Sequence, residues 1–202
     1  MNSARVASRV ALAALITGSL WALGCGGSSG SSGIGGGFTA SSTATSPGLI
    51  KLVKKSSSGS HVVVSAVLYG PVSADLYSFA FDVVVGNTTT AKFVPSSASP
   101  GDTLMASGGQ TIQAEADVSG SDATHVVVGV SKLGGGTGNS TTANTTIVNL
   151  TFALQAAGTT SLAIATSPAP QALDSTGTPI GGVTFDSAAG SLSGTSSGGG
   201  GY

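Results

Sequence analysis

Apolar and polar residues alternate with a period of two along several short segments between residues 48 and 192. One of them, His61–Tyr69, is rich in valine and is bounded by glycine, serine and proline, as strands commonly are. Successive side chains of a strand point to opposite faces, so each alternation predicts one buried face. The apolar members of these alternations are Tyr77, Phe79, Phe81, Val83 and Val85; Val126, Val128 and Val130; Val148, Leu150, Phe152 and Leu154; and Leu162 and Ile164.

Glycine and proline clusters separate the alternating segments, at residues 95–101, 134–138 and 168–170, and a late strand is expected within 180–185. No stretch of ten or more residues combines a 3.6-residue apolar period with helix caps. Several short strands with turn signals between them are typical of a sandwich or barrel. We therefore expect one all-β domain of about nine strands over residues 48–192.

The segments on either side of this domain have a different composition. Residues 25–47 and 193–202 consist largely of glycine, serine, threonine and alanine. Such segments cannot bury enough apolar surface to fold by themselves. They predict a flexible tether over 25–47 and a disordered tail over 193–202.

Residues 1–24 have the features of a secretory signal peptide. Arg5 and Arg9 supply the positive start, and an apolar run follows over residues 10–23. This run of about 14 residues is shorter than the roughly 20 that a spanning helix needs. The segment therefore predicts export and removal rather than a permanent transmembrane helix.

Cys25 follows this apolar run directly, in the stretch Ala22-Leu23-Gly24-Cys25. The stretch resembles the lipoprotein box of bacteria, although the box usually has leucine at the position of Ala22. Cys25 is the only cysteine, so it cannot form an internal disulfide. The alternative is an incidental residue of a discarded signal. We expect acylation of Cys25 and a membrane-anchored lipoprotein of the bacterial cell envelope.

Charge is sparse in this chain. Charged residues make up 7% of it against roughly 25% in an average domain, while hydrophobic residues make up 40%. Wholesale disorder usually goes with the opposite composition. Without the signal segment, five lysines stand against eight acidic residues, which gives a net charge near −3. Lys51, Lys54 and Lys55 form the only basic cluster, and a solvated strand end accounts for it. Nucleic acid is therefore not an expected partner.

Candidate catalytic residues are few. His125 lies close to Asp122, but no Gly-x-Ser-x-Gly elbow supplies a nucleophile, and His61 is isolated. Glu115 and Asp117 are two residues apart on one predicted strand face, a spacing that could seat a glycosidase pair. Two solvated side chains on a polar face explain the same spacing. We therefore expect no enzyme.

The sequence predicts no metal and no cofactor. Asp174-Ser-Thr-Gly-Thr has part of the pattern of a calcium loop, but a β-turn explains it better. The glycine-rich loop 134–138 lacks the lysine of a phosphate-binding loop. Sugar-stacking aromatic residues are scarce, since Trp21 lies in the signal segment and only Tyr69 and Tyr77 are candidates in the domain.

Four segments together resemble the cohesin domain. They are residues 76–85 with 93–94, residues 127–138, residues 147–160 and residues 173–180. The resemblance covers about 48–192 and implies a jelly-roll β-sandwich related to certain carbohydrate-binding modules. In cellulosomes such domains dock dockerin modules through one sheet face. One departure is Gly86-Asn87, where the family often has an Asp-Pro turn. The binding residues are therefore unknown at this stage.

The sequence thus favours a lipid-anchored extracytoplasmic protein whose cohesin-like domain binds another protein through a sheet face. The alternative is a carbohydrate-binding module that serves polysaccharide catabolism. Exposed aromatic residues on one sheet face would favour that alternative. A third hypothesis is a structural component of an envelope assembly.

Overall fold

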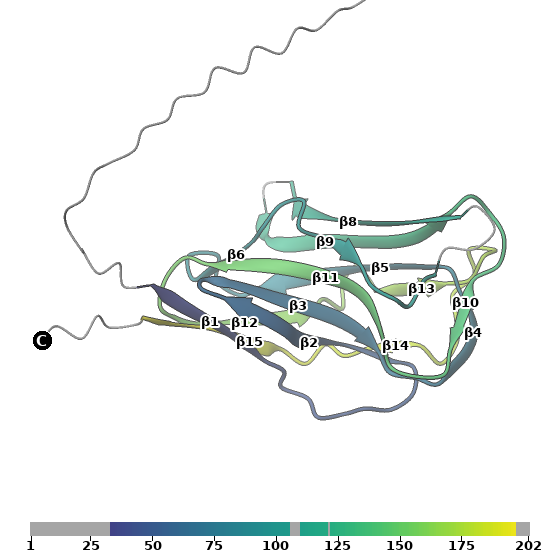
Figure 1. Cartoon of the computed structure of the whole chain (residues 1–202), viewed down its shortest axis with the longest axis horizontal. Coiled ribbons are helices and arrows are strands. Elements are labelled where there is room, and N and C mark those ends of the chain that lie inside the picture. Colours follow the sequence, from purple (N-terminus) through teal and green to yellow (C-terminus); the bar gives the residue numbers. More distant parts are fainter. Residues whose placement is uncertain (1–32, 106–109, 121, 197–202) are drawn as a thin grey trace, which may run out of the picture. The chain divides into compact units, whose positions relative to one another are not determined.

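The computed structural model describes residues 33–105, 110–120 and 122–196, and in these residues the chain forms strands and no helix (Figure 1). None of this part of the chain could therefore cross a membrane as a helix. The strands are β1 (Ile34–Thr39), β2 (Leu49–Ser58), β3 (His61–Leu68), β4 (Val72–Leu76), β5 (Ser78–Val85), β6 (Ala91–Phe93), β7 (Ser99–Pro100), β8 (Thr111–Ser119), β9 (Asp122–Leu133), β10 (Asn139–Thr141), β11 (Thr145–Leu154), β12 (Gly158–Ile164), β13 (Gln171–Leu173), β14 (Thr184–Phe185) and β15 (Gly190–Ser196).

The strands form two main sheets that pack face to face as a β-sandwich, which confirms the all-β prediction. The seven-stranded sheet has the order β1-β15-β12-β5-β9-β8, with β13 also paired to β5. The six-stranded sheet has the order β14-β2-β3-β11-β6, with β7 also paired to β11. Strands β4 and β10 form a separate two-stranded ribbon. All pairs are antiparallel except that of β14 with β2.

The predicted number of about nine strands is too low, because the described residues hold fifteen strands. Five of these, β6, β7, β10, β13 and β14, are only two or three residues long. A period-two alternation needs about four residues to be visible, so strands this short leave no pattern in the sequence.

One apolar core fills the space between the sheets, and it is built from the predicted alternations. Phe79, Phe81, Val83 and Val85 of β5 are all buried, while Tyr77, which was grouped with them, precedes the strand and is only half-buried. Within the six-stranded sheet, Phe93 of β6 is paired with Phe152 of β11, and their rings meet edge to face at 5.8 Å. The other predicted members that are buried here are Val126, Val128, Val130, Val148, Leu150, Phe152, Leu154, Leu162 and Ile164.

The predicted boundaries of the domain need correction, because parts of both flanking segments belong to the sandwich. Strand β1 lies within the predicted tether, and it pairs with β15, whose last residues lie within the predicted tail. In this pair Ile34 faces Ser196 and Phe38 faces Leu192, and Phe38 is buried. The rest of the predicted tether before residue 33 and of the tail after residue 196 lies outside the described residues.

The glycine-rich composition of β1 has a packing reason. A Cβ at Gly36 would lie 2.6 Å from Val62 Cγ2 and 2.8 Å from Leu154 Cδ1, so only glycine allows β1 to approach the core this closely. Glycine therefore marks a close approach of two elements here, which composition alone cannot distinguish from a linker.

The outer face of the six-stranded sheet is partly covered by the connection from β1 to β2. Lys51 Nζ donates hydrogen bonds to the backbone carbonyls of Ser42 (3.0 Å) and Ala44 (2.8 Å), and it lies 5.0 Å from the centroid of the Tyr69 ring. Lys51 is consequently buried, which corrects the expectation of a solvated basic cluster; only Lys54 and Lys55 are exposed.

Candidate interaction surface

The outer face of the seven-stranded sheet is open over strands β5, β8 and β9. It is formed by the residues that alternate with the buried ones, and the register places Ala80, Gly129 and Glu115 side by side across the three strands. We call this surface the outer face. Its members are Ser78, Ala80, Asp82 and Val84 of β5; Thr111, Gln113, Glu115 and Asp117 of β8; and His125, Val127, Gly129, Ser131 and Leu133 of β9.

A shallow hollow lies at the middle of the outer face. Its volume is about 350 Å³, and its floor is Gly129, where a Cβ would meet no atom within 4 Å. Ala80 on one side and Glu115 on the other border it. Small side chains in the centre of three adjacent strands therefore leave room for a protruding group of a partner.

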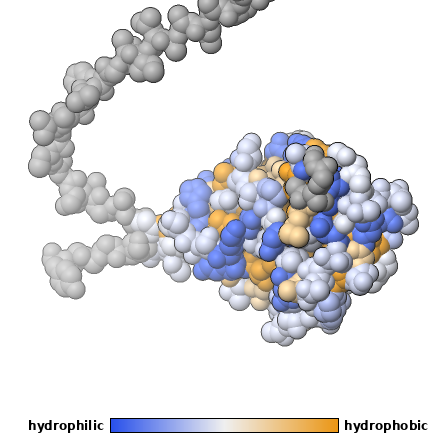
Figure 2. Space-filling model, turned by 45° about the vertical axis from the view of Figure 1, so that its right-hand side comes forward, coloured by the Kyte–Doolittle hydropathy of each residue, from blue (hydrophilic) through white to orange (hydrophobic). Residues whose placement is uncertain are grey.

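Two exposed apolar side chains lie on β9, one on each side of this hollow along the strand. Val127 is 48% exposed and Leu133 is 43% exposed, and both lie on the outer face. Met105 is the other large apolar side chain exposed among the described residues. Most of the surface visible in Figure 2 is pale, the colour of residues near neutral hydropathy such as serine and threonine. Val127 and Leu133 are separate rather than one contiguous patch, so they add to the candidate contact surface only together with the hollow between them.

The charges of the outer face are acidic. Glu115 and Asp117 are exposed on it, and the side chain of Asp82 lies 3.7 Å from His125 Nδ1. Asp122 Oδ2 lies 3.9 Å from His125 Nε2, and its pKa is lowered mainly by the hydrogen bond from the Thr124 hydroxyl. A complementary partner would therefore carry basic or hydroxyl groups.

No lysine of the described residues compensates this acidity on the outer face. Lys51, Lys54, Lys55 and Lys92 all lie on strands of the six-stranded sheet. Lys132 alternates to the inner side of β9 and is 2% exposed; its Nζ donates to the carbonyl of Thr137 (3.0 Å) and to Asn139 Oδ1 (2.8 Å). Among the described residues, the outer face of the seven-stranded sheet therefore carries carboxylates and no lysine.

The carboxylate pair identified in the sequence lies where it was predicted, with Glu115 and Asp117 on one face of β8. Gln113 Nε2 donates to Glu115 Oε1, and the backbone N–H of Val118 donates to Asp117 Oδ1 at 2.8 Å. Both carboxylates are exposed on a strand at the sheet edge, without the enclosed pocket in which a glycosidase tunes its acid and base. Glu115 and Asp117 are therefore best described as solvent-exposed side chains on a polar strand face.

The two histidines are not brought together. His61 begins β3 and is exposed, whereas His125 lies on β9 between two carboxylates. In the part of the chain that the structure describes, the contacts of His125 are with Asp82 and Asp122 rather than with a serine hydroxyl. The geometry therefore contains carboxylate–histidine contacts without the nucleophile of a hydrolytic triad.

The Asp174 segment is the predicted turn. Asp174 Oδ1 accepts hydrogen bonds from the backbone N–H groups of Thr176 (2.8 Å) and Thr178 (2.9 Å), and from the Thr176 hydroxyl (2.7 Å). Gly177 in the same turn has φ +81°, a conformation that glycine adopts easily. Residues 33–105, 110–120 and 122–196 hold no cluster of three potential metal ligands.

The aromatic residues of the described chain are all buried or half-buried. None belongs to the exposed large apolar side chains, and the two sugar-stacking candidates, Tyr69 and Tyr77, are both half-buried. Tyr69 lies against Lys51 at the covered face of the six-stranded sheet. The described surface therefore lacks an exposed aromatic platform. Trp21 and the lipidation candidate Cys25 lie outside the described residues.

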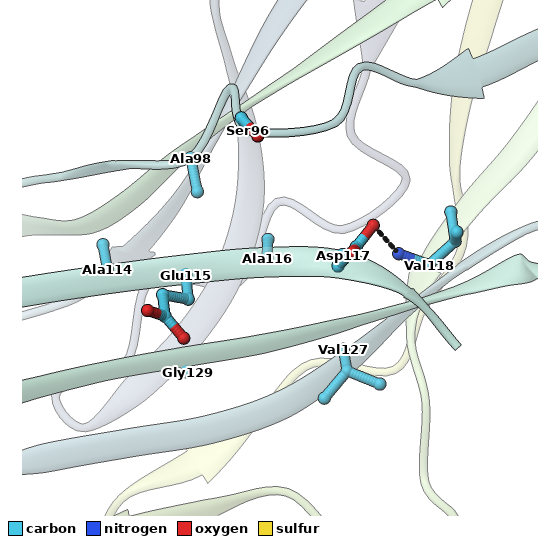
Figure 3. A pocket seen from close by; sticks show the side chains of 9 residues that line it. All are labelled: Ser96, Ala98, Ala114, Glu115, Ala116, Asp117, Val118, Val127 and Gly129. Atoms are coloured by element: carbon cyan, nitrogen blue, oxygen red, sulfur yellow. Dashed lines mark hydrogen bonds between the residues drawn. The ribbon is translucent and has the colours of Figure 1, made fainter. Parts of the chain in front are cut away.

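A groove runs along the free edge of β8, next to the outer face (Figure 3). Its volume is about 650 Å³. In Figure 3, Ala114 and Ala116 point toward the connection between β6 and β7, which carries Ser96 and Ala98, and Glu115 points the other way. Glu115 and Asp117, which line this groove, are candidates from the sequence, but the sequence could not predict the groove itself. The groove forms between segments about 20 positions apart, and its other wall consists of small residues such as Ser96 and Ala98.

Comparison with known proteins identifies the fold. No family model matches the chain, and no curated protein matches it. Among solved structures, it is similar to the sixth cohesin of scaffoldin B from Acetivibrio cellulolyticus, which was solved in complex with a dockerin. That match has 19% identity and a TM-score of 0.51, and it covers 71% of this chain and 97% of the cohesin.

Two further cohesins show similar coverage. The second type II cohesin module of the adaptor scaffoldin ScaA of Acetivibrio cellulolyticus has 10% identity and a TM-score of 0.49, with 68% of this chain and 84% of that chain covered. Type II cohesin A11 of Bacteroides cellulosolvens has 11% identity and a TM-score of 0.47, with 68% and 94% covered.

Proposed function

We propose that this chain, whose domain has the cohesin-like fold, is a lipid-anchored extracytoplasmic protein that docks a protein partner on the outer face of the seven-stranded sheet. The observation that carries the proposal is the outer face itself. It combines a hollow at Gly129, the exposed side chains of Val127 and Leu133, and an acidic rim formed by Glu115 and Asp117.

The choice of face follows from what covers the other sheet. The outer face of the six-stranded sheet is occupied near Lys51 by the chain's own residues 42–44. The outer face of the seven-stranded sheet is open, and on it the exposed apolar side chains of Val127 and Leu133 lie among carboxylates and hydroxyls. Protein interfaces combine apolar and polar groups in this way. The partner that fits has an apolar protrusion flanked by lysine, arginine or hydroxyl side chains.

The fold supports this type of partner. The sixth cohesin of scaffoldin B was solved in complex with a dockerin. A dockerin-like module is therefore the first partner class to test. The same fold supports a role in binding rather than in catalysis, in line with the carboxylates and histidines that form no catalytic constellation in the described residues.

The membrane anchor is part of the proposal and rests on the sequence. Acylation of Cys25 would place the lipid nine residues before β1 begins at Ile34. A chain of that length spans at most about 30 Å. The domain would thus stay close to the envelope surface to which it is anchored, and its partner would be another envelope or surface protein.

Carbohydrate binding is the second candidate, and one observation counts against it. Sugar-binding surfaces usually stack pyranose rings on exposed aromatic side chains, and no aromatic residue in the described chain is exposed. The remaining polar surface could contact a glycan only through hydrogen bonds. Polysaccharide therefore ranks behind protein as the ligand.

The docking proposal is tested by affinity capture from envelope extract with the mature chain. Ala80 is exposed beside the hollow, so Ala80→Arg should place a long charged side chain in the interface and abolish specific capture. Ala157→Arg makes the same change in the exposed turn between β11 and β12 and should leave capture intact. Capture that survives Ala80→Arg would exclude the outer face. Retention on a polysaccharide column without any protein partner would support the carbohydrate alternative.

A further inference from the structure

Strand β8 is the last strand of the seven-stranded sheet. In the described chain it pairs with β9 along its whole length and has no strand on its other side. A strand in this position normally presents every second backbone N–H and C=O group to solvent or to another chain.

The register identifies which groups of β8 face outward. The backbone N–H of Lys132 donates to the carbonyl of Tyr77 at 3.1 Å, so it points toward β5 and away from β8. Ile112 is opposite Lys132, and this pair therefore exchanges no ladder hydrogen bonds. By alternation, the N–H and C=O groups of Ala114, Ala116 and Val118 also point to the free edge.

Val118 provides independent support for this assignment. Its N–H donates to the carboxylate of its own neighbour, Asp117 Oδ1, at 2.8 Å, rather than to β9. At this end of the strand, the outward N–H group of Val118 thus already has a hydrogen-bond acceptor in the neighbouring side chain. Among the described residues, no side chain hydrogen-bonds to the outward backbone groups of Ala114 or Ala116 in the middle of the strand.

The groove beside this edge has room for a further strand. Ser96 and Ala98 form its far wall, and Ala114 and Ala116 form its near wall. These four side chains are small. The volume of about 650 Å³ also extends around β8 to its outer side, where Glu115, Asp117, Val127 and Gly129 line it. The outward N–H and C=O groups of β8 and the space for the backbone of an additional strand therefore lie at the same edge of the sheet.

The charges of β8 indicate what the additional strand would carry. Glu115 and Asp117 project on the outer side of β8 and are exposed, with no lysine of the described residues on that face. Pairing with the β8 strand of a second copy would bring these carboxylates close to their own counterparts, and like charges across strands are destabilising. A strand with lysine or arginine at every second position is complementary instead.

We propose that β8 binds an extended peptide segment of a partner protein as an additional strand of the seven-stranded sheet. The segment alternates small apolar residues, which face Ala98, Ala114 and Ala116, with basic residues, which face Glu115 and Asp117. Backbone hydrogen bonds to β8 give the affinity, and the alternation gives the specificity. This site borders the hollow on the outer face and shares Glu115 and Gly129 with it. It differs from that hollow in using the outward backbone groups of β8, and it does not require the function proposed there.

The test uses the mature chain and a short, end-blocked peptide that alternates lysine and valine. We expect saturable binding by fluorescence anisotropy. Amide exchange of Ile112, Ala114 and Ala116 should slow when the peptide binds, whereas that of Glu115, which already faces β9, should stay unchanged. A peptide that alternates glutamate and valine should not bind.

Ala116→Pro is the informative variant. Proline removes an outward N–H but no ladder hydrogen bond, and edge strands tolerate it in this orientation. We expect an increase of about tenfold in the dissociation constant, with the unfolding midpoint nearly unchanged. Ala157→Arg, in the exposed turn between β11 and β12, should not affect peptide binding. Affinity capture with the Ala116→Pro protein should still succeed if the proposed docking surface is used, and this separates the two proposals.

Peptides N-methylated at every second residue keep their charge and lose backbone donors on one edge. Methylation of the residues whose N–H groups point toward β8 should abolish binding. Methylation of the alternate residues, whose N–H groups point away from β8, should not. Equal binding of both methylated peptides would show mere charge attraction and overturn the proposal. Absence of binding at millimolar peptide, or unchanged affinity in a folded Ala116→Pro protein, would also overturn it.

Discussion

The carboxylate of Asp75 binds Ser175 across 100 positions of sequence. Its Oδ2 accepts hydrogen bonds from both the backbone N–H, at 3.1 Å, and the hydroxyl of Ser175. Its Oδ1 accepts a further hydrogen bond from the backbone N–H of Gly138. One side chain of β4 therefore joins the loop after β9 to the turn after β13, at the end of the sandwich where three connections meet.

The first prediction concerns stability. Asp75→Ala removes the acceptor for all three hydrogen bonds and leaves the two connecting loops without their common partner. We expect the melting temperature to fall by roughly 2–4 °C, measured by circular dichroism. Glu115→Ala removes an exposed carboxylate from β8 and should leave the melting temperature unchanged. Equal melting temperatures of the Asp75→Ala and Glu115→Ala variants would contradict the structural role of Asp75.

The second prediction concerns pH. The pKa of Asp75 is lowered from its ordinary value of 3.8, first by the hydrogen bond from the Ser175 hydroxyl and then by that from the Ser175 N–H. Asp174 and Asp122 also have lowered pKa values, mainly through the hydroxyls of Thr176 and Thr124. An ionised group of this kind stabilises the fold well above pH 3.8. Its contribution is lost as the pH falls through the lowered folded-state pKa.

We therefore expect urea midpoints to decline as the pH falls below about 4. Asp75→Asn should lower the midpoint at neutral pH and make its decline in acid shallower, because one of the three linked groups no longer titrates. Urea titrations between neutral pH and strong acid measure both effects. A decline as steep as that of the unmodified protein would assign the acid sensitivity to other groups.

The third prediction compares two glycines in strands. A side chain at Gly36 would overlap Val62 and Leu154 in the core, whereas a side chain at Gly129 would meet no atom within 4 Å. Gly36→Val should reduce the free energy of unfolding by about 1–3 kcal/mol through overpacking. Gly129→Val should be neutral or slightly stabilising, since valine favours strands. Chemical denaturation of the two variants provides the comparison, and the reverse order would contradict the placement of β1 against the core.

The fourth prediction concerns the domain boundaries. A protein that comprises residues 48–192 lacks β1 and the end of β15, and thus lacks Phe38 from the core. Burial of a phenylalanine contributes about 1.5–3 kcal/mol, so this protein should be less stable than one that comprises 33–196 by at least that amount. Parallel urea titrations measure the difference. Equal stabilities would show that β1 is dispensable.

The fifth prediction concerns the anchor. Cys25→Ser removes the thiol that we expect to be acylated and should move the protein from the membrane fraction to the soluble extracytoplasmic fraction. Mass spectrometry of the mature N-terminus should find acyl groups on the unmodified protein and none on the variant. A mature protein that begins elsewhere, without a lipid, would refute the lipoprotein prediction.

The buried half of the fold could be predicted from sequence, because inward side chains leave a regular alternation. The alternation around Phe79 and Phe81 identified β5, and the fold class followed from several such segments. The outer face was harder to identify. The alternation of Val126, Val128 and Val130 already places Val127 on the opposite face of its strand. It could not show that this face is open to solvent, because that depends on whether another segment of the chain covers it.

Two other features could not be predicted for a related reason. Strand β1 has the composition of a linker, since glycine is needed both for flexibility and for close packing. Lys51 is buried because the carbonyls of Ser42 and Ala44 happen to lie within reach of its ammonium group. The strand β1 and the burial of Lys51 both depend on contacts between segments that are distant in the sequence. The alternation of apolar and polar residues along one segment carries no information about such contacts.

The antiparallel pairing of β1 with β15 determines how the domain responds to mechanical force. Ile34 faces Ser196, so the chain enters and leaves the sheet at the same end. A pull between these two ends would open the β1–β15 ladder one residue pair at a time, like a zipper. A pull between an anchored Cys25 and a partner held on the sheet would instead draw β1 along its own axis and shear all of its backbone hydrogen bonds together. The strand with the composition of a linker would then be the part that resists detachment under tension.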